Sequence, residues 1–202
     1  MKKKVYIVRH GQTLFNKKNK IQGWCDSPLT PLGHAQARAT KAYFEKRGIR
    51  FDKACCSTLH RTEETLKDIT SMPYSRNEDL KEFHYGDLEG ESTDLGCKKG
   101  DDLNTFYVAH GGESPKEVED RVERAIRHLV EEDDAQSILI VAHGSNSFRF
   151  ANRVEPKRAR KMRKFANCVI YEYEYEDGTF HLLDVIDEHV KDIKDPIEKK
   201  SR

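Results

Sequence analysis

Two short apolar runs constrain the fold of this 202-residue chain more than any other feature. Residues 5–8 (VYIV) and 138–142 (ILIVA) are apolar at consecutive positions rather than at alternating ones. Such runs are typical of strands that are buried on both faces of a sheet, between two layers of helices. We therefore expect a sheet with helices on both of its faces.

Helical segments alternate with strands along most of the chain. A helix is predicted at 30–47, with a threonine N-cap, a first-turn proline and a closing glycine. A short strand at 51–57 precedes a helix at 58–70, and a serine-capped helix at 114–134 precedes the strand at 137–142. This alternation indicates an α/β fold, a three-layer sandwich with a mostly parallel central sheet.

The last third of the chain departs from that pattern. Residues 168–175 and 179–186 predict a hairpin, and the first strand alternates apolar residues with glutamates as an edge strand would, so an antiparallel edge strand is expected. The glycine-rich stretch at about 86–112 is interpreted as an insertion that covers the active site, and the charged tail from about 187 as solvated or frayed. Residues 1–202 are assigned to a single domain.

Composition argues against several classes of function. The net charge is +1 although 35% of residues are charged, which argues against a dedicated nucleic-acid or membrane binder. No apolar run is long enough to span a bilayer, and the N-terminal MKKK leads into a strand without a signal-peptide apolar region, so a cytoplasmic location is expected. Five cysteines favour reduced thiols, and the absence of a CxxC or HxxxH pair argues against a metal site.

Polar residues follow three of the predicted strands where each strand ends. Arg9 and His10 follow the first, Arg61 lies one helical turn beyond the second, and His143 follows the third. Carboxyl ends of parallel strands meet at one edge of a sheet, where ligands bind. Guanidinium groups and backbone amides at helix N-termini pair with phosphate oxygens, and glycines after both histidines let the backbone approach a ligand. The sequence therefore predicts a site for a tetrahedral oxyanion such as phosphate.

The basic run RVEPKRARKMRK at 153–164 has two interpretations. Such a run is most often one solvated face of a helix, and the near-neutral net charge of +1 favours that reading. The alternative is that the run guides an anionic substrate toward the site. Both remain open from the sequence.

Six motifs occur in an order that resembles a known family. They are RHGQT at 9–13, IQGWCDSPLT at 21–30, CSTLHRTEET at 56–65, LKEFHYGDLEG at 80–90, GGESPKEVEDR at 111–121 and VAHGSNSFRF at 141–150. Together they resemble the histidine phosphatase superfamily, the phosphoglycerate mutase-like family, from Val5 to about Phe150. The resemblance implies phosphoryl transfer through a phosphohistidine, with no metal or cofactor.

The resemblance assigns two residues to the chemical steps. His10 would be the nucleophile, and Glu82 would protonate the leaving oxygen before it deprotonates the water that releases phosphate. A carboxylate beside a phosphate dianion is pushed toward its protonated form, which suits Glu82 to the acid role. A histidine nucleophile needs its other ring nitrogen held as a donor, and a backbone carbonyl around Gly11 is the expected partner.

The resemblance also assigns residues that bind the substrate. The phosphoryl oxygens would be held by Arg9, Arg61 and His143, with Asn16, Gln22, Gly23 and the backbone amide of Gly144 as further contacts. For Asn16 and Gln22, which lie on a polar loop, capping and turn hydrogen bonds are nearly as good an interpretation.

Three activities share these residues, and we favour a phosphatase-type member, a phosphomonoester hydrolase. Phe83 stands where phosphoglycerate mutases usually carry an arginine, and the insertion contains no arginine, although Lys98 and Lys99 would partly substitute. The pocket aromatics expected for organic monoesters are Trp24, Phe83, Tyr85, Phe106 and Tyr107. The alternatives are a cofactor-dependent phosphoglycerate mutase and a non-catalytic phospho-ligand binding module. The expected partner is a small phosphorylated substrate or inorganic phosphate, bound by a monomer or homodimer.

Overall fold

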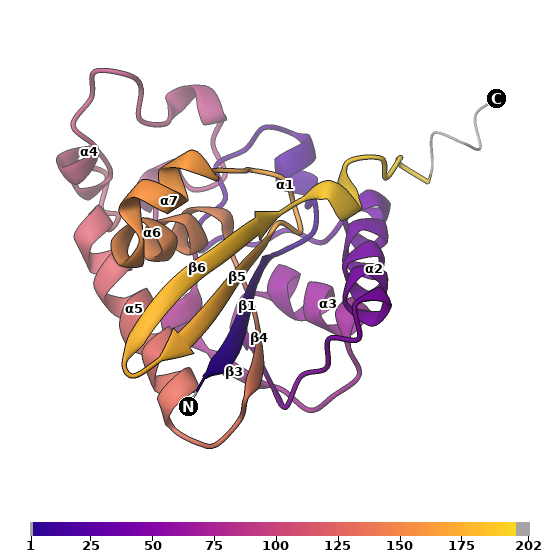
Figure 1. The fold of residues 1–202 in the computed structure, drawn as a ribbon. Coiled ribbons are helices and arrows are strands. Elements are labelled where there is room, and N and C mark those ends of the chain that lie inside the picture. The colour runs from indigo at the N-terminus through magenta and orange to yellow at the C-terminus, as the bar shows by residue number, and fades with distance from the viewer. Residues whose placement is uncertain (1, 197–202) are drawn as a thin grey trace.

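The computed structural model describes residues 2–196, which form a six-stranded sheet with helices on both faces (Figure 1). The strands are β1 (Lys3–Arg9), β2 (Lys53–Ser57), β3 (Ser75–Asn77), β4 (Ser137–Ala142), β5 (Ile170–Glu176) and β6 (Thr179–Ile186). The helices are α1 (Leu14–Lys17), α2 (Pro31–Lys46), α3 (His60–Ile69), α4 (Leu103–Ala109), α5 (Pro115–Glu131), α6 (Gly144–Val154) and α7 (Pro156–Lys161). The strand order is β3-β2-β4-β1-β5-β6, and β1 to β4 run parallel, which confirms the mostly parallel α/β sandwich.

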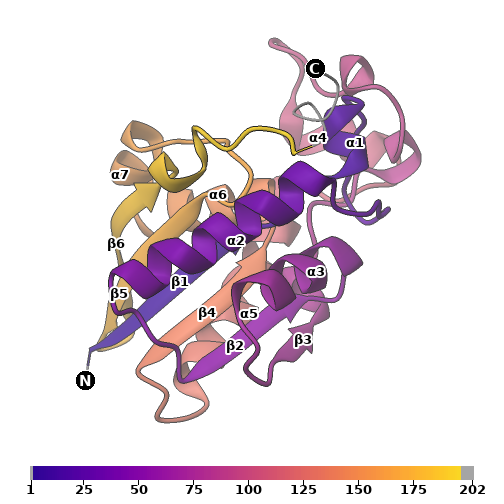
Figure 2. The ribbon, with the colours of Figure 1, turned by 90° about the vertical axis from the view of Figure 1, so that its right-hand side faces the viewer.

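Consecutive residues of β1 belong to two cores, one on each face of the sheet. Val5 and Ile7 pack in the core that contains α5 and α6, whereas Tyr6 and Val8 pack in the core that contains α2 and α3. Figure 2 shows α2 lying along the second of these faces. A strand covered on both faces needs an apolar residue at every position, which explains why the run at 5–8 does not alternate.

The first turn of α2 is packed against the loop that follows β1. Thr30 caps the helix by accepting a hydrogen bond from the amide of Gly33. A Cβ on Gly11 would lie 2.5 Å from the carbonyl oxygen of Gly33, so no larger residue fits there without displacing backbone. The packing of α2 therefore requires a glycine after His10, and the approach of its backbone to a ligand stays a prediction.

The hairpin lies at one side of the sheet, but its first strand is not at the edge. β5 pairs with both β1 and β6, and β6 is the edge strand, antiparallel to β5. The glutamates of β5 lie beside lysines near the N-terminus: Glu174 pairs with Lys2 at 2.9 Å, and Lys4 lies 3.9 Å from Glu172. The alternating glutamates of β5 form a face that pairs with lysines and do not indicate a free edge. The prediction that this strand lies at the edge of the sheet is therefore wrong. At the other edge, β3 was not predicted.

Two irregular regions are more ordered than the sequence pattern suggests. The stretch at 86–112 contains α4, of which only Tyr107 is buried, so its apolar pattern is weak. In the tail, Val190 is buried, and His189 Nε2 lies 3.0 Å from Thr40 Oγ1 on α2. The expected solvated tail is therefore wrong for its first residues, and positions 197–202 lie outside the described residues.

Candidate active site

His10 directly follows β1 and is 4% exposed. Its amide donates to the carbonyl oxygen of Ala142 at 3.0 Å, which extends the pairing of β1 with β4 by one residue. Its Nδ1 lies 2.8 Å from the carbonyl oxygen of Gly11, the expected kind of contact. Because a carbonyl only accepts, Nδ1 carries the hydrogen of the neutral ring and Nε2 keeps its lone pair. Nε2 is therefore able to attack an electrophile.

Burial and neighbouring arginines keep two imidazoles of this region neutral. Burial, followed by the charges of Arg61 and Arg9, lowers the pKa of His10 well below its usual value. His143 follows β4, and its ring centroid lies 5.3 Å from that of His10. Burial and Arg61 likewise lower the pKa of His143. Among residues 2–196, neither ring nitrogen of the fully buried His143 has a hydrogen-bond partner, and buried groups of this kind recur where a ligand binds.

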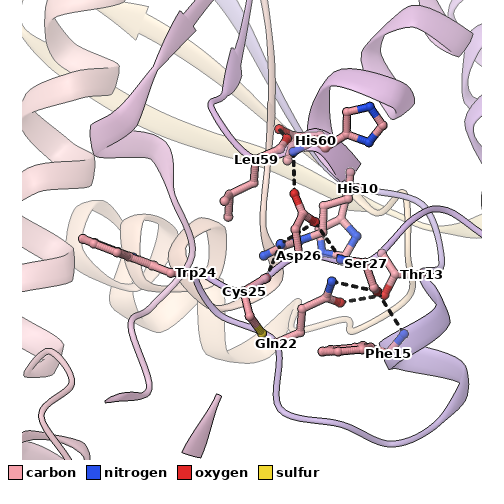
Figure 3. A network of polar contacts seen from close by, with 12 residues as sticks. His10, Thr13, Phe15, Gln22, Trp24, Cys25, Asp26, Ser27, Leu59 and His60 are labelled. Atoms are coloured by element: carbon pink, nitrogen blue, oxygen red, sulfur yellow. Dashed lines mark hydrogen bonds and ion pairs between the residues drawn. The ribbon is translucent and has the colours of Figure 1, made fainter. Parts of the chain in front are cut away.

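Arg61 lies on α3 with its side chain fully buried. Its Nη1 donates to the carbonyl of Cys25 and to Asp26, both at 3.0 Å, and its Nη2 donates to the carbonyl of Gly23 at 2.7 Å. Asp26 also accepts the amide of His60 at the start of α3, so the loop and the helix are tied together (Figure 3). The Nε of Arg61 is buried and has no hydrogen-bond partner within the described part of the chain. The loop thus fixes the guanidinium and leaves Nε–H and one Nη2 hydrogen for a ligand.

Arg9 is the last residue of β1 and points toward the C-terminal half of the chain. Its Nη1 donates to the carbonyl of Phe165, and its buried Nε has no partner among the residues that the structure describes. Burial lowers the pKa of Arg9, and the charge of Glu82 opposes that effect. A Cβ on Gly144 would lie 3.1 Å from this Nε, so the helix N-terminus approaches the guanidinium closely. Arg9 therefore offers Nε–H beside the first residue of α6.

Glu82 reaches the N-terminus of α6. One carboxylate oxygen accepts the amides of Phe83 at 2.9 Å and Asn146 at 3.0 Å, and the other accepts the amide of Ser145 at 2.9 Å. Negative charge is favoured at this end of a helix. Glu82 is 6% exposed, so these contacts hold it in one place next to Gly144.

Arg121 on α5, which was not among the predicted site residues, fixes the segment that carries Glu82. Its Nη2 donates to the carbonyl of Glu82 at 2.8 Å, its Nη1 donates to that of Lys81 at 2.7 Å, and its charge is paired with Glu113. Asn146 supports the same segment through its side-chain amide, which donates to Leu80. Both residues lie in motifs that resemble the histidine phosphatase superfamily, and this was the signal that could have identified them.

Asn16 and Gln22 contact protein groups as well as the cavity described below. Gln22 accepts the Thr13 hydroxyl at 2.6 Å and donates to Ser27 at 3.0 Å (Figure 3). Asn16 accepts the amide of Thr13 and the side-chain amide of Asn167, at 3.2 and 3.1 Å. The capping and turn bonds considered as an alternative are therefore present, and both side chains also line the cavity.

Glu89 holds the loop that carries the carbonyl groups bound by Arg61. Its carboxylate accepts the amides of Gly23, Trp24 and Cys25, at 3.1, 2.8 and 2.9 Å. Burial would raise the pKa of Glu89, but hydrogen bonds from the Cys25 thiol and from backbone amides, including that of Tyr85, lower it overall. Glu89 belongs to the stretch at 86–112, so part of that stretch shapes the site from behind.

A cavity of about 540 Å³ opens where β1 and β4 end. The predicted site residues that line it are Arg9, His10, Asn16, Gln22, Glu82 and Gly144. Arg61, His143 and Gly23 are brought to the same region but lie behind the lining, where each is buried. The structure therefore gathers the predicted residues in two layers, one that lines the cavity and one that is buried directly behind it.

The aromatic lining differs from the expectation. Tyr85 and Tyr107 line the cavity, whereas Trp24, Phe83 and Phe106 do not. Phe148 and Phe165, which were not predicted, do line it. Phe83 is instead buried beneath Tyr85, with ring centroids 5.1 Å apart. Neither Lys98 nor Lys99 lines the cavity, so the expected partial substitution for mutase arginines is not seen.

Comparison with known proteins agrees with this arrangement. The family model of the histidine phosphatase superfamily (branch 1) matches residues 5–188. The chain belongs to this superfamily. A 2,3-bisphosphoglycerate-dependent phosphoglycerate mutase from Mesorhizobium japonicum is 35% identical over 164 residues, which cover 74% of this chain and 79% of the relative.

Solved structures of histidine phosphatase relatives share the fold. Phosphoglycerate mutase from Bacillus anthracis superposes with a TM-score of 0.82 at 22% identity, over 94% of this chain and 95% of that one. Phosphoserine phosphatase from Entamoeba histolytica superposes with a TM-score of 0.75 at 24% identity, over 93% and 99%. The same architecture thus carries proteins named as mutases and as phosphatases.

Two further observations concern the described residues as a whole. Within positions 2–196, no three histidine, cysteine or acidic side chains gather in a way that could hold a metal ion. None of the helices found there is both long and apolar enough to cross a membrane.

Proposed function

We propose that this histidine phosphatase superfamily member is a metal-independent hydrolase of small phosphomonoesters. The observation that carries the proposal is the state of His10, which lines the cavity with Nδ1 held by Gly11 and Nε2 unprotonated. Near it lie groups that have no hydrogen-bond partner in residues 2–196, namely Nε of Arg9, Nε of Arg61 and the ring of His143. A phosphoryl group satisfies such donors.

The reaction has two steps. Nε2 of His10 attacks phosphorus while the bond from phosphorus to the ester oxygen breaks, and Glu82, which the bound phosphate dianion pushes toward its protonated form, gives its proton to that oxygen. Water then attacks the phosphohistidine, Glu82 takes the proton from the water, and the phosphorus–nitrogen bond breaks to release phosphate. Arg9 and Arg61 stabilise the charge on the equatorial oxygens in both steps.

Phe83 favours hydrolysis over a mutase reaction. A mutase must retain a bisphosphorylated intermediate, and mutases of this superfamily usually carry an arginine at this position. Phe83 is 1% exposed and offers no charge. The second candidate is a phosphoglycerate mutase, and the names of relatives such as the Mesorhizobium japonicum protein favour it.

The first experiment measures phosphate release from p-nitrophenyl phosphate with EDTA present. We expect turnover by the wild type, a loss of about 10⁴-fold or more in His10→Ala, and no loss in His128→Ala, whose side chain is exposed on α5. Isomerisation of 3-phosphoglycerate with 2,3-bisphosphoglycerate that outpaces hydrolysis would instead support the mutase. Phosphate binding without turnover of either substrate would support the binding module.

The second experiment tests Glu82 through the leaving group. Glu82→Gln cannot donate a proton, so hydrolysis of an alkyl phosphate should fall by about 10² to 10⁴-fold. The loss with p-nitrophenyl phosphate should be much smaller, because that leaving group needs little protonation. Equal losses with both esters would contradict the acid role.

A further inference from the structure

The residues of the basic run at 153–164 have different surroundings in the structure. Arg153 pairs with Asp120 and Glu123, and Arg158 donates to a backbone carbonyl. Arg160 donates to Asn152. Within this run, Arg163 is the residue that lines the cavity. One member of a surface run is thus placed where a substrate would bind.

Two aromatic rings hold the Arg163 guanidinium. Its central carbon lies 4.4 Å from the ring centroid of Phe148 and 4.3 Å from that of Phe165. The carbonyl of Phe165 accepts the hydrogen bond from Arg9, so this segment is tied to the end of β1. Contact with ring faces leaves the N–H groups, which lie in the guanidinium plane, available to an anion. Among residues 2–196, no carboxylate lies within 4.0 Å of the Arg163 guanidinium nitrogens.

Two more cations line the same cavity. Lys20 donates to the carbonyl of Gly90 at 2.7 Å, and it has no ion pair among the described residues. Arg149 lies 3.4 Å from Glu119, while its buried Nε has no hydrogen-bond partner among positions 2–196. Arg149 follows Gly144 by five positions on α6, a rise of roughly 7.5 Å. Arg149 therefore lies several ångströms from the end of the cavity at Gly144, and Lys20 and Arg163 line the same cavity.

We propose that Arg163, with Arg149 and Lys20, forms a second anion subsite. The preferred substrate is then a phosphomonoester whose short organic part carries a second negative group, a carboxylate or another phosphate. This inference rests on the proposed function, because it places the transferred phosphoryl group at His10. The two carboxylates in the lining are already engaged, Glu82 by backbone amides and Glu119 by Arg149, so Arg163 and Lys20 keep their attraction for a ligand.

The test compares kcat/KM for three esters at low salt. They are glycerol 1-phosphate, whose organic part is neutral, 3-phosphoglycerate, which adds a carboxylate, and propane-1,3-diol bisphosphate, which adds a phosphate. We expect the wild type to prefer one or both anionic esters by about tenfold or more, and Arg163→Gln to lose most of that preference. Whichever anionic ester is favoured identifies the group that the subsite binds.

Two control variants separate the subsite from general charge effects. Arg163→Lys keeps the charge and should retain part of the preference. Lys157→Gln removes an exposed charge from the same run outside the cavity lining and should leave the preference intact. The preference should also weaken as salt is added, because Arg163 is exposed.

Failure of the subsite and failure of the proposed function give different results. Hydrolysis of all three esters with no preference, or with a preference that Arg163→Gln retains, would overturn the subsite and leave the hydrolase standing. If no ester is hydrolysed, the proposed function fails. In that case, calorimetry measures the affinities of the wild type and of Arg163→Gln for 3-phosphoglycerate and glycerol 1-phosphate. A preference for 3-phosphoglycerate that Arg163→Gln loses supports the subsite, and a preference that is absent or retained overturns it.

Discussion

The two ends of the cavity are built differently. At the inner end, His10 and His143 follow central strands, and His143 and Arg61 are fully buried. At the outer end, Arg163 and Phe165 lie on the segment between α7 and β5, and Phe165 is 65% exposed. A residue held by the sheet keeps the geometry that phosphoryl transfer requires, whereas a residue on a connecting segment can change with little cost to the fold. Substitutions at the inner end should therefore lower both the catalytic rate and the stability of the fold. Substitutions at the outer end should change only the affinity for the substrate.

Arg61→Met should show the largest combined effect. The carbonyls of Gly23 and Cys25 and the carboxylate of Asp26 would lose their buried donor. We expect the free energy of unfolding to fall by about 3 kcal/mol and kcat/KM for p-nitrophenyl phosphate to fall by about 10³-fold. Urea unfolding and steady-state kinetics measure the two effects.

Arg38→Met is the matched control for that variant. Arg38 lies on the exposed side of α2, 3.8 Å from Asp68, and its loss should cost no more than about 0.5 kcal/mol. If both variants were equally stable, the loop at 23–26 would not depend on Arg61.

The inner end was predictable because its signals are local. His10 and His143 each follow an apolar strand directly, and Arg61 lies one helical turn beyond a third, so sheet topology alone brings them together. The family motifs added Glu82, whose position next to the start of α6 no local pattern indicates.

The supporting residues and the outer end depend on contacts that are distant in sequence. Arg121 binds carbonyls about 40 positions earlier in the chain, and Glu89 binds a loop about 65 positions earlier. Phe165 reaches the cavity because its carbonyl meets Arg9 at the other end of the chain. Phe165 directly follows the basic run at 153–164, for which the sequence left open both a solvated helix face and a role in guiding an anionic substrate.

Acid should destabilise the protein through the inner end. The pKa values of His10 and His143 are lowered in the folded protein, so below pH about 6.5 the unfolded chain binds protons that the folded chain does not. The free energy of unfolding therefore has its full value above that pH. It falls as the pH decreases, by at most about 1.4 kcal/mol per pH unit for each histidine.

Urea unfolding between pH 5.5 and 7.5 measures this slope. His10→Gln should remove the share that belongs to His10, whereas His128→Gln, on the exposed face of α5, should leave the slope as it is. A slope that His10→Gln did not reduce would place the acid sensitivity elsewhere in the molecule.

Phe165→Ala should have the smallest effect, and it separates the two ends most cleanly. The substitution removes a ring that holds the Arg163 guanidinium but keeps the carbonyl that accepts from Arg9. We expect KM for an anionic ester to rise about threefold, with kcat unchanged and stability within about 0.5 kcal/mol of the wild type, because the ring is largely exposed. Leu95→Ala, which removes another exposed apolar side chain outside the cavity lining, should leave KM unchanged. A fall in kcat instead would mean that the outer segment positions Arg9 for the chemical step, and the two ends would then act as one unit.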